Sequence, residues 1–180
     1  MITLIRHGEA AASWGAHPDP GLSETGHDQA EAVATVLKSQ SISSILTSPM
    51  QRCRETAQPL EKALGQTAIV TPEVSEIPTP PDLTTSRVDW LKGLMSGKWS
   101  EAPMLIQQWR DDLIQKVTAL PDDTVVFTHF VAINAIVSAF EGSDKAVVFR
   151  PTYCSQTVLE RDADMLKVTR RGAEAATRVL

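Results

Sequence analysis

The sequence predicts an α/β fold, a three-layer sandwich in which a mainly parallel sheet lies between helices on both faces. Three short apolar segments have the length and composition of buried strands: 2–5, 42–46 and 125–128. Each is followed by a longer segment with helical spacing of apolar residues. A repeated order of strand and then helix is typical of a parallel sheet that is covered on both sides.

The first strand is expected at Ile2–Ile5, where the apolar run stops at Arg6. Two prolines and two glycines within 17–26 predict a loop. A helix follows, for which Ser23 and Thr25 are both possible N-caps. Its apolar residues have helical spacing and form one expected face: Ala30, Val33, Ala34 and Leu37.

The second strand, 42–46, precedes a predicted helix over 50–64, in which Pro59 is expected to kink the helix or reset its start. A brief third strand is expected at 68–70. Four prolines within 71–81 predict a loop, and we interpret 71–100 as a lid or substrate-pocket insertion. Within that insertion, helical stretches are expected to break at Gly93 and Gly97.

A helix is expected over 104–120, and a further one over 130–140 after the strand 125–128. Four residues of the first helix are expected to lie along one face: Leu105, Trp109, Leu113 and Val117. Gly142 is the expected C-cap of the second helix. A late hairpin is predicted from 157–159 and 166–169, and a weak helix from Gly172.

Composition excludes several classes of protein. The chain has 180 residues, of which 42% are hydrophobic and 22% charged, which predicts one globular domain over 1–180. A net charge of −5 argues against a nucleic-acid-binding protein. No apolar run approaches the ~20 residues of a membrane span, and Arg6 comes too early for a signal peptide. With Cys53 and Cys154 as small core residues, we expect a cytoplasmic protein without a membrane partner.

Basic side chains follow the predicted strands, and they define a candidate site. Arg6 and His7 follow the first strand, Arg52 follows the second, and His129 follows 125–128. Ligands of open α/β sheets bind at the carboxyl ends of the strands, so these four side chains are expected to meet. Arginines bind phosphate oxygens in a fork, and a neutral histidine can attack phosphorus. The pattern indicates a small phosphorylated substrate.

The same residues lie in blocks that resemble the histidine phosphatase superfamily, which includes the cofactor-dependent phosphoglycerate mutases. The first block carries the Arg6-His7-Gly8 motif, and the blocks occur in the family's order: 4–9, 22–26, 48–57, 125–129 and 154–160. The resemblance covers nearly the whole chain. It implies a phosphoglycerate mutase-like fold of the three-layer kind described above.

The resemblance also implies roles for individual residues. His7 is the implied nucleophile that carries the phosphoryl group, and Arg6, Arg52 and His129 are implied to hold phosphate oxygens. The implied proton donor is a carboxyl group after the second block. Glu73 and Glu76 are both candidates, and the position of Glu76 before Ile-Pro favours it.

The substrate pocket departs from the family pattern. Gly8, Ser13 and Phe130 are the candidate pocket residues; Phe130 stands where Gly is common in the family, and Ser13 where Asn is. A bulky apolar Phe130 is expected to narrow the pocket. Three tryptophans after the proline-rich segment are more often core residues, although they could also roof the pocket: Trp90, Trp99 and Trp109.

The expected activity is hydrolysis of a phosphomonoester through a phosphohistidine on His7. No metal or other cofactor is expected, because two arginines and two histidines supply the positive charge that Mg²⁺ supplies elsewhere. Four histidines and two cysteines show no spacing typical of zinc ligands, and His17 and His27 are expected at the surface. One alternative is a mutase-type phosphoryl transferase, disfavoured by the short chain. The other is a non-catalytic phosphate-binding module on the same scaffold.

Overall fold

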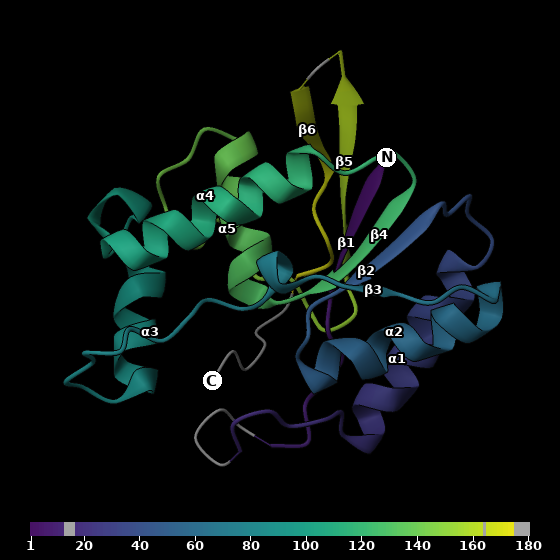
Figure 1. Ribbon diagram of the computed structural model, residues 1–180, viewed down its shortest axis with the longest axis horizontal. Coiled ribbons are helices and arrows are strands. Elements are labelled where there is room, and N and C mark those ends of the chain that lie inside the picture. The colour runs from purple at the N-terminus through teal and green to yellow at the C-terminus, as the bar shows by residue number, and fades with distance from the viewer. Residues whose placement is uncertain (13–16, 164, 175–180) are drawn as a thin grey trace.

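Over the residues that the structure describes, the fold contains a mixed sheet of six strands. Figure 1, drawn from the computed structural model, shows helices on both faces of this sheet. The structure describes residues 1–12, 17–163 and 165–174. The strand order is β3-β2-β4-β1-β5-β6, and the first four of these strands are parallel to one another. The strands are β1 (Ile2–Arg6), β2 (Ser44–Thr47), β3 (Ile69–Val70), β4 (Thr124–Thr128), β5 (Gln156–Asp162) and β6 (Met165–Arg170). The predicted fold class is confirmed.

Alternation along the strands divides the core into two parts. Ile5 and Phe127 face one side of the sheet, where they pack with buried residues of α1 (Glu24–Leu37) and α2 (Gln51–Leu64). Leu4 and Val126 face the other side and pack with α4 (Met104–Thr118) and α5 (Phe130–Phe140). Successive side chains of a strand point to opposite faces of the sheet. Both faces of every central strand are therefore buried, as expected for the middle layer of a sandwich.

The helices α1 and α2 follow the predicted boundaries closely. Ser23, and not Thr25, is the N-cap of α1, because its Oγ accepts a hydrogen bond of 3.0 Å from the Gly26 N–H. Pro59 lies inside an uninterrupted α2, so the expectation that it resets the helix is wrong. The helix buries Cys53, Ala57 and Leu60 against the sheet, and this packing outweighs the loss of one backbone hydrogen bond.

Two expectations about the next segment require correction. Gly93 lies within α3 (Arg87–Ser96), so only Gly97 ends that helix. In α4, Leu105 is 46% exposed, and Ile106 takes its place in the core. At 3.6 residues per turn, Ile106 is about two turns before Leu113, whereas Leu105 is rotated away by about 80°.

The C-terminal part forms the predicted hairpin of β5 and β6. Glu141 is the C-cap of α5, and Gly142, the expected C-cap, is the next residue and has a positive φ of 67°. The weak helix expected from Gly172 is absent over 172–174, and its remainder lies outside the described residues. Instead, Glu174 forms an isolated bridge with Pro151, and the Gly172 N–H donates to Thr157 Oγ1. Over the ranges that the structure describes, no helix is long and apolar enough to cross a membrane.

Two glycines bring the loop after β1 against the start of α1. A Cβ on Gly26 would lie 2.1 Å from the Glu9 carbonyl oxygen, and one on Gly8 would lie 2.7 Å from the Gly26 carbonyl oxygen. The close approach is between backbone atoms, so no side-chain rotation can relieve a clash. This contact fixes the loop that carries His7 against α1.

We expect Gly26→Ala to destabilise the protein by about 1–3 kcal/mol, because the added methyl group overpacks a rigid backbone contact. Urea unfolding monitored by circular dichroism measures this change. Gly93→Ala is the matched control, because no atom lies within 4 Å of its added Cβ. The control should raise the free energy of unfolding by roughly 0.5–1 kcal/mol. Equal effects of the two substitutions would contradict the steric argument.

Candidate active site

The four predicted basic residues meet at one edge of the sheet. β4 lies between β2 and β1, and all three strands run in parallel, so their carboxyl ends meet there. His7 directly follows β1, His129 directly follows β4, and Arg52 lies in the first turn of α2 after β2. The side chains are almost completely buried, with exposed fractions of 2% for Arg6, 8% for His7, 1% for Arg52 and 0% for His129.

Arg52 connects the two histidines. Its Nε donates to His7 Nε2 at 3.2 Å, and its Nη2 lies 3.1 Å from His129 Nδ1. A guanidinium group only donates hydrogen bonds, so both of these ring nitrogens are acceptors. His7 Nδ1 lies 2.7 Å from the Gly8 carbonyl oxygen and therefore carries the ring proton. The arrangement leaves the lone pair of His7 on Nε2.

The environment keeps both histidines neutral. Burial, followed by the charges of Arg52 and Arg6, lowers the pKa of His7 well below its ordinary value. The pKa of His129 is also lowered well below its ordinary value, first by burial and then by the charge of Arg52. Because His129 Nδ1 accepts from Arg52, its Nε2 carries the proton and donates to Ser48 Oγ at 2.8 Å. Neutral His7 is thus a nucleophile, and neutral His129 a hydrogen-bond donor.

Arg6 is held by a segment that the sequence analysis did not connect with the site. Its Nη1 donates to the Pro151 carbonyl oxygen at 2.8 Å, and its guanidinium carbon lies 4.0 Å from the ring centroid of Tyr153. The Phe130 ring lies 5.3 Å away and is 1% exposed. Phe130 therefore packs against Arg6, and its expected effect on the width of the pocket stays a prediction.

The two candidate acids occupy different environments. Glu76 Oε1 accepts a hydrogen bond of 3.0 Å from the Ile77 N–H, and its Oε2 accepts one of 3.4 Å from the Val131 N–H in the first turn of α5. Burial raises the pKa of Glu76, although these hydrogen bonds and the charges of Arg52 and Arg6 oppose the rise. Glu73 is exposed in the short 3₁₀ helix η1 (Pro72–Val74).

Polar side chains that the sequence analysis missed support the His7 loop and Arg52. Thr56 Oγ1 accepts from the Gly8 N–H at 3.0 Å and donates to the Arg52 carbonyl oxygen at 2.6 Å. The carboxylate of Asp19 accepts from the Gln51 N–H at the start of α2, and it lies 3.9 Å from Arg52 Nη1. The position of Thr56, one helical turn after Arg52, was a signal that could have identified it.

The other residues singled out in the sequence contribute no described side chain to this cluster. Ser13 falls outside the described residues. Gly8 supports His7 through its backbone and its contact with Gly26. Arg54, His17 and His27 are exposed. In the part of the chain that the structure describes, no group of three or more His, Cys, Asp or Glu side chains could hold a metal ion.

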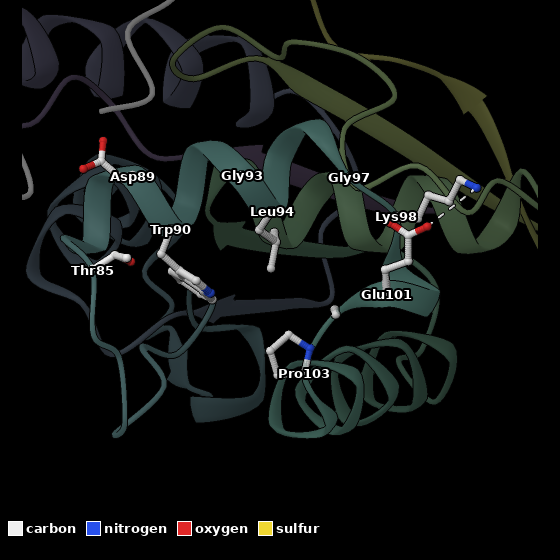
Figure 2. Close-up of a pocket in the computed structure, with 10 residues that line it drawn as sticks. Thr85, Asp89, Trp90, Gly93, Leu94, Gly97, Lys98, Glu101 and Pro103 are labelled. Atoms are coloured by element: carbon white, nitrogen blue, oxygen red, sulfur yellow. Dashed lines mark ion pairs between the residues drawn. The ribbon is translucent and has the colours of Figure 1, made fainter.

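A separate cavity of about 450 Å³ lies along α3 and the segment before α4, as Figure 2 shows. Trp90 and Leu94 line it, together with Pro103. The other two tryptophans are core residues: Trp99 is 3% exposed and donates from Nε1 to Ser138 Oγ, and Trp109 packs on it with 6.3 Å between ring centroids. The core interpretation thus fits Trp99 and Trp109, whereas Trp90 lines this cavity.

Comparisons with known proteins find matches in sequence and in fold. A family model described as the histidine phosphatase superfamily (branch 1) matches residues 2–82. A relative from Photorhabdus laumondii, named "Probable phosphoglycerate mutase GpmB", is 34% identical over 54% of this chain and 50% of its own length. The matched region thus spans half the length of that relative. A protein of the same name from Serratia proteamaculans is 24% identical over 93% of this chain and 84% of its own.

Solved structures share the fold over nearly the whole chain. A phosphoserine phosphatase from Entamoeba histolytica, in complex with 3-phosphoglyceric acid, has a TM-score of 0.77, with 20% identity over 96% of both chains. A mycobacterial glucosyl-3-phosphoglycerate phosphatase has a TM-score of 0.73, with 22% identity over 96% of this chain and 99% of that one. The family model that matches residues 2–82 describes the same superfamily that the sequence resembles.

We expect Arg52→Met to raise the pKa of both His7 and His129, because it removes a neighbouring positive charge. The rise should be partial, because burial, the larger cause, remains. Nitrogen-detected NMR of the histidine rings across pH measures both the pKa and the tautomer. Arg54→Met is the matched control, since Arg54 lies on the same helix and is exposed. Equal shifts in the two variants would contradict the role of Arg52.

Proposed function

We propose that this protein is a phosphatase that hydrolyses a small phosphomonoester through a phosphohistidine intermediate on His7. The observation that carries the proposal is the geometry of His7. Its Nε2 holds a lone pair beside Arg52, while Nδ1–H is fixed on the Gly8 carbonyl oxygen. A histidine in this state can attack phosphorus without first losing a proton.

In the first step, His7 Nε2 attacks the phosphorus and forms a P–N bond as the ester P–O bond breaks. Glu76 donates a proton to the departing oxygen, so the product leaves as an alcohol. In the second step, Glu76 takes a proton from water, which attacks phosphorus as the P–N bond breaks. Phosphate is released, and both His7 and Glu76 return to their starting states.

Arg6, Arg52 and His129 are proposed to hold the phosphoryl oxygens during both steps. Two guanidinium groups stabilise the negative charge that a phosphoryl group carries, and His129 adds a neutral donor. We propose that these groups make a metal ion unnecessary, so activity persists in excess EDTA. A requirement for added Mg²⁺ after treatment with EDTA would contradict this part of the proposal.

Glu76 is the proposed acid, and its raised pKa supports this role. A carboxyl group must retain its proton near neutral pH in order to donate it to an alkoxide. Burial favours the protonated form of Glu76, while Glu73 lies exposed in η1.

The segment 71–100 contributes Glu76, which is consistent with the proposed role of this segment as a substrate-pocket insertion of a single domain over 1–180. We place the activity in the cytoplasm, without a nucleic-acid or membrane partner.

Phosphoglycerate mutase activity is the second candidate, because the relatives carry that name. The two reactions differ in the fate of the phosphoryl group. A mutase returns it to the substrate, whereas a phosphatase transfers it to water. An assay with 3-phosphoglycerate and a bisphosphoglycerate primer measures both products, and we expect phosphate release to exceed formation of the isomer. The opposite ratio would favour the mutase.

We expect His7→Ala to lower phosphate release by more than about 10³-fold. Rapid acid-free quenching of the wild type with ³²P-labelled ester should trap an acid-labile, alkali-stable label that His7→Ala lacks. Phosphate binding without turnover of any ester by the wild type would instead favour the non-catalytic phosphate-binding module.

Glu76→Gln should lower release from an alkyl phosphate by roughly 10²–10⁴-fold, but affect p-nitrophenyl phosphate far less. An alkoxide needs a proton in order to leave, whereas nitrophenolate does not. Glu73→Gln is the matched control and should change neither rate appreciably. The role of Glu76 would be refuted by equal losses on the two esters.

A further inference from the structure

Tyr153 lies beside two of the proposed catalytic residues and has no part in the reaction described above. The centroid of its ring is 4.0 Å from the guanidinium carbon of Arg6. The same centroid is 5.9 Å from that of the His7 ring, and the two rings are tilted by 45° to each other. Tyr153 is half-buried, in the turn before β5, and it is the only tyrosine of the chain.

The backbone on both sides of Tyr153 is bound to Arg6. The Pro151 carbonyl oxygen accepts a hydrogen bond from Arg6 Nη1 at 2.8 Å, and the Cys154 N–H donates to the Arg6 carbonyl oxygen at 3.0 Å. Cys154 has a φ of 55°, in the left-handed region that residues other than glycine seldom adopt. Such backbone strain persists only where the surrounding structure holds it, and it is frequent at functional sites. The turn thus presents Tyr153 to Arg6 in one arrangement.

An aromatic ring over a guanidinium group restricts how that group can bind an anion. The electron-rich face of the ring attracts the cation, and the ring covers one face of the planar group. The hydrogen bonds of the group lie in its plane, where it binds two phosphate oxygens as a fork. Burial lowers the pKa of Arg6, and Tyr153 is among the groups that raise it, so the tyrosine also favours the charged form.

We propose that Tyr153 positions Arg6 for the phosphoryl group, by holding the plane of the guanidinium group against the face of its ring. This inference rests on the proposed phosphatase activity and adds a positioning residue to it. Tyr153 acts through Arg6, and it takes no part in the transfer of the phosphoryl group or of a proton.

Tyr153→Leu removes the ring and should weaken the binding of orthophosphate about tenfold, because a desolvated contact between a cation and a ring is lost. We expect KM for a phosphomonoester to rise by a similar factor while kcat changes less, since Arg6 binds the phosphoryl group both before and during the reaction. Tyr153→Phe keeps the ring face and should retain most of the affinity. Calorimetry with orthophosphate measures binding without turnover.

Phe149→Leu is the matched control for packing in the same part of the chain. Phe149 is a buried ring whose centroid lies 5.4 Å from the guanidinium carbon of a different arginine, Arg171. Its replacement should leave the affinity for orthophosphate unchanged. Equal losses in Phe149→Leu and Tyr153→Leu would show that both act only through packing, and would overturn the positioning role.

A label on the only tyrosine tests the inference even if Tyr153→Leu does not fold. Protein made with 3-fluorotyrosine should give one ¹⁹F NMR signal, which orthophosphate should shift with the dissociation constant that calorimetry gives. A signal that stays unchanged at saturating orthophosphate would refute the contact between Tyr153 and the phosphate-binding form of Arg6.

The outcomes separate this inference from the proposed function. Loss of affinity in Tyr153→Leu, with recovery in Tyr153→Phe, would support the positioning role even if no ester were hydrolysed. Unchanged affinity in Tyr153→Leu would overturn that role and leave the proposed activity intact. An equal loss in Tyr153→Phe would assign the effect to the hydroxyl group, against the role of the ring face. Wild type that does not bind orthophosphate would contradict both proposals.

Discussion

The arrangement of the site depends on one side chain, the Arg52 guanidinium, which contacts both histidines at about the same distance. These contacts make His7 Nε2 and His129 Nδ1 acceptors and thereby determine where each ring holds its proton. They also place a buried positive charge next to two groups that could otherwise become protonated. The Arg52 side chain thus fixes both the orientation of the two histidine rings and the nitrogen that carries the proton in each ring.

A buried arginine with this role must itself be held in place. Helix α2 supplies most of that support, because its packing face against the sheet continues through Pro59 and anchors the turn that carries Arg52. Thr56 links the Arg52 carbonyl oxygen to the Gly8 N–H, so it ties α2 to the loop after β1. Asp19 accepts a hydrogen bond at the start of α2, where a negative charge also favours the helix dipole.

The central part of the fold could be predicted from the sequence. The spacing of apolar residues along its strands and helices shows which side chains are buried. The meeting of His7, Arg52 and His129 followed from a rule about parallel strands, which needs only that the strands before them run in the same direction. Tyr153 was missed because its contact with Arg6 depends on the path of an irregular loop, where residue spacing carries no information. Leu105 shows the limit within a helix, where an error of one residue rotates the predicted face by about 100°.

The contact between Gly8 and Gly26 limits how this sequence can diverge. Most packing contacts tolerate paired replacements, in which a smaller side chain on one element compensates for a larger one on the other. Here both partners are backbone atoms, so no second substitution can make room for the first. Among descendants of this chain, the two positions should therefore stay fixed together. Methods that infer proximity from correlated changes would therefore find no signal at this contact.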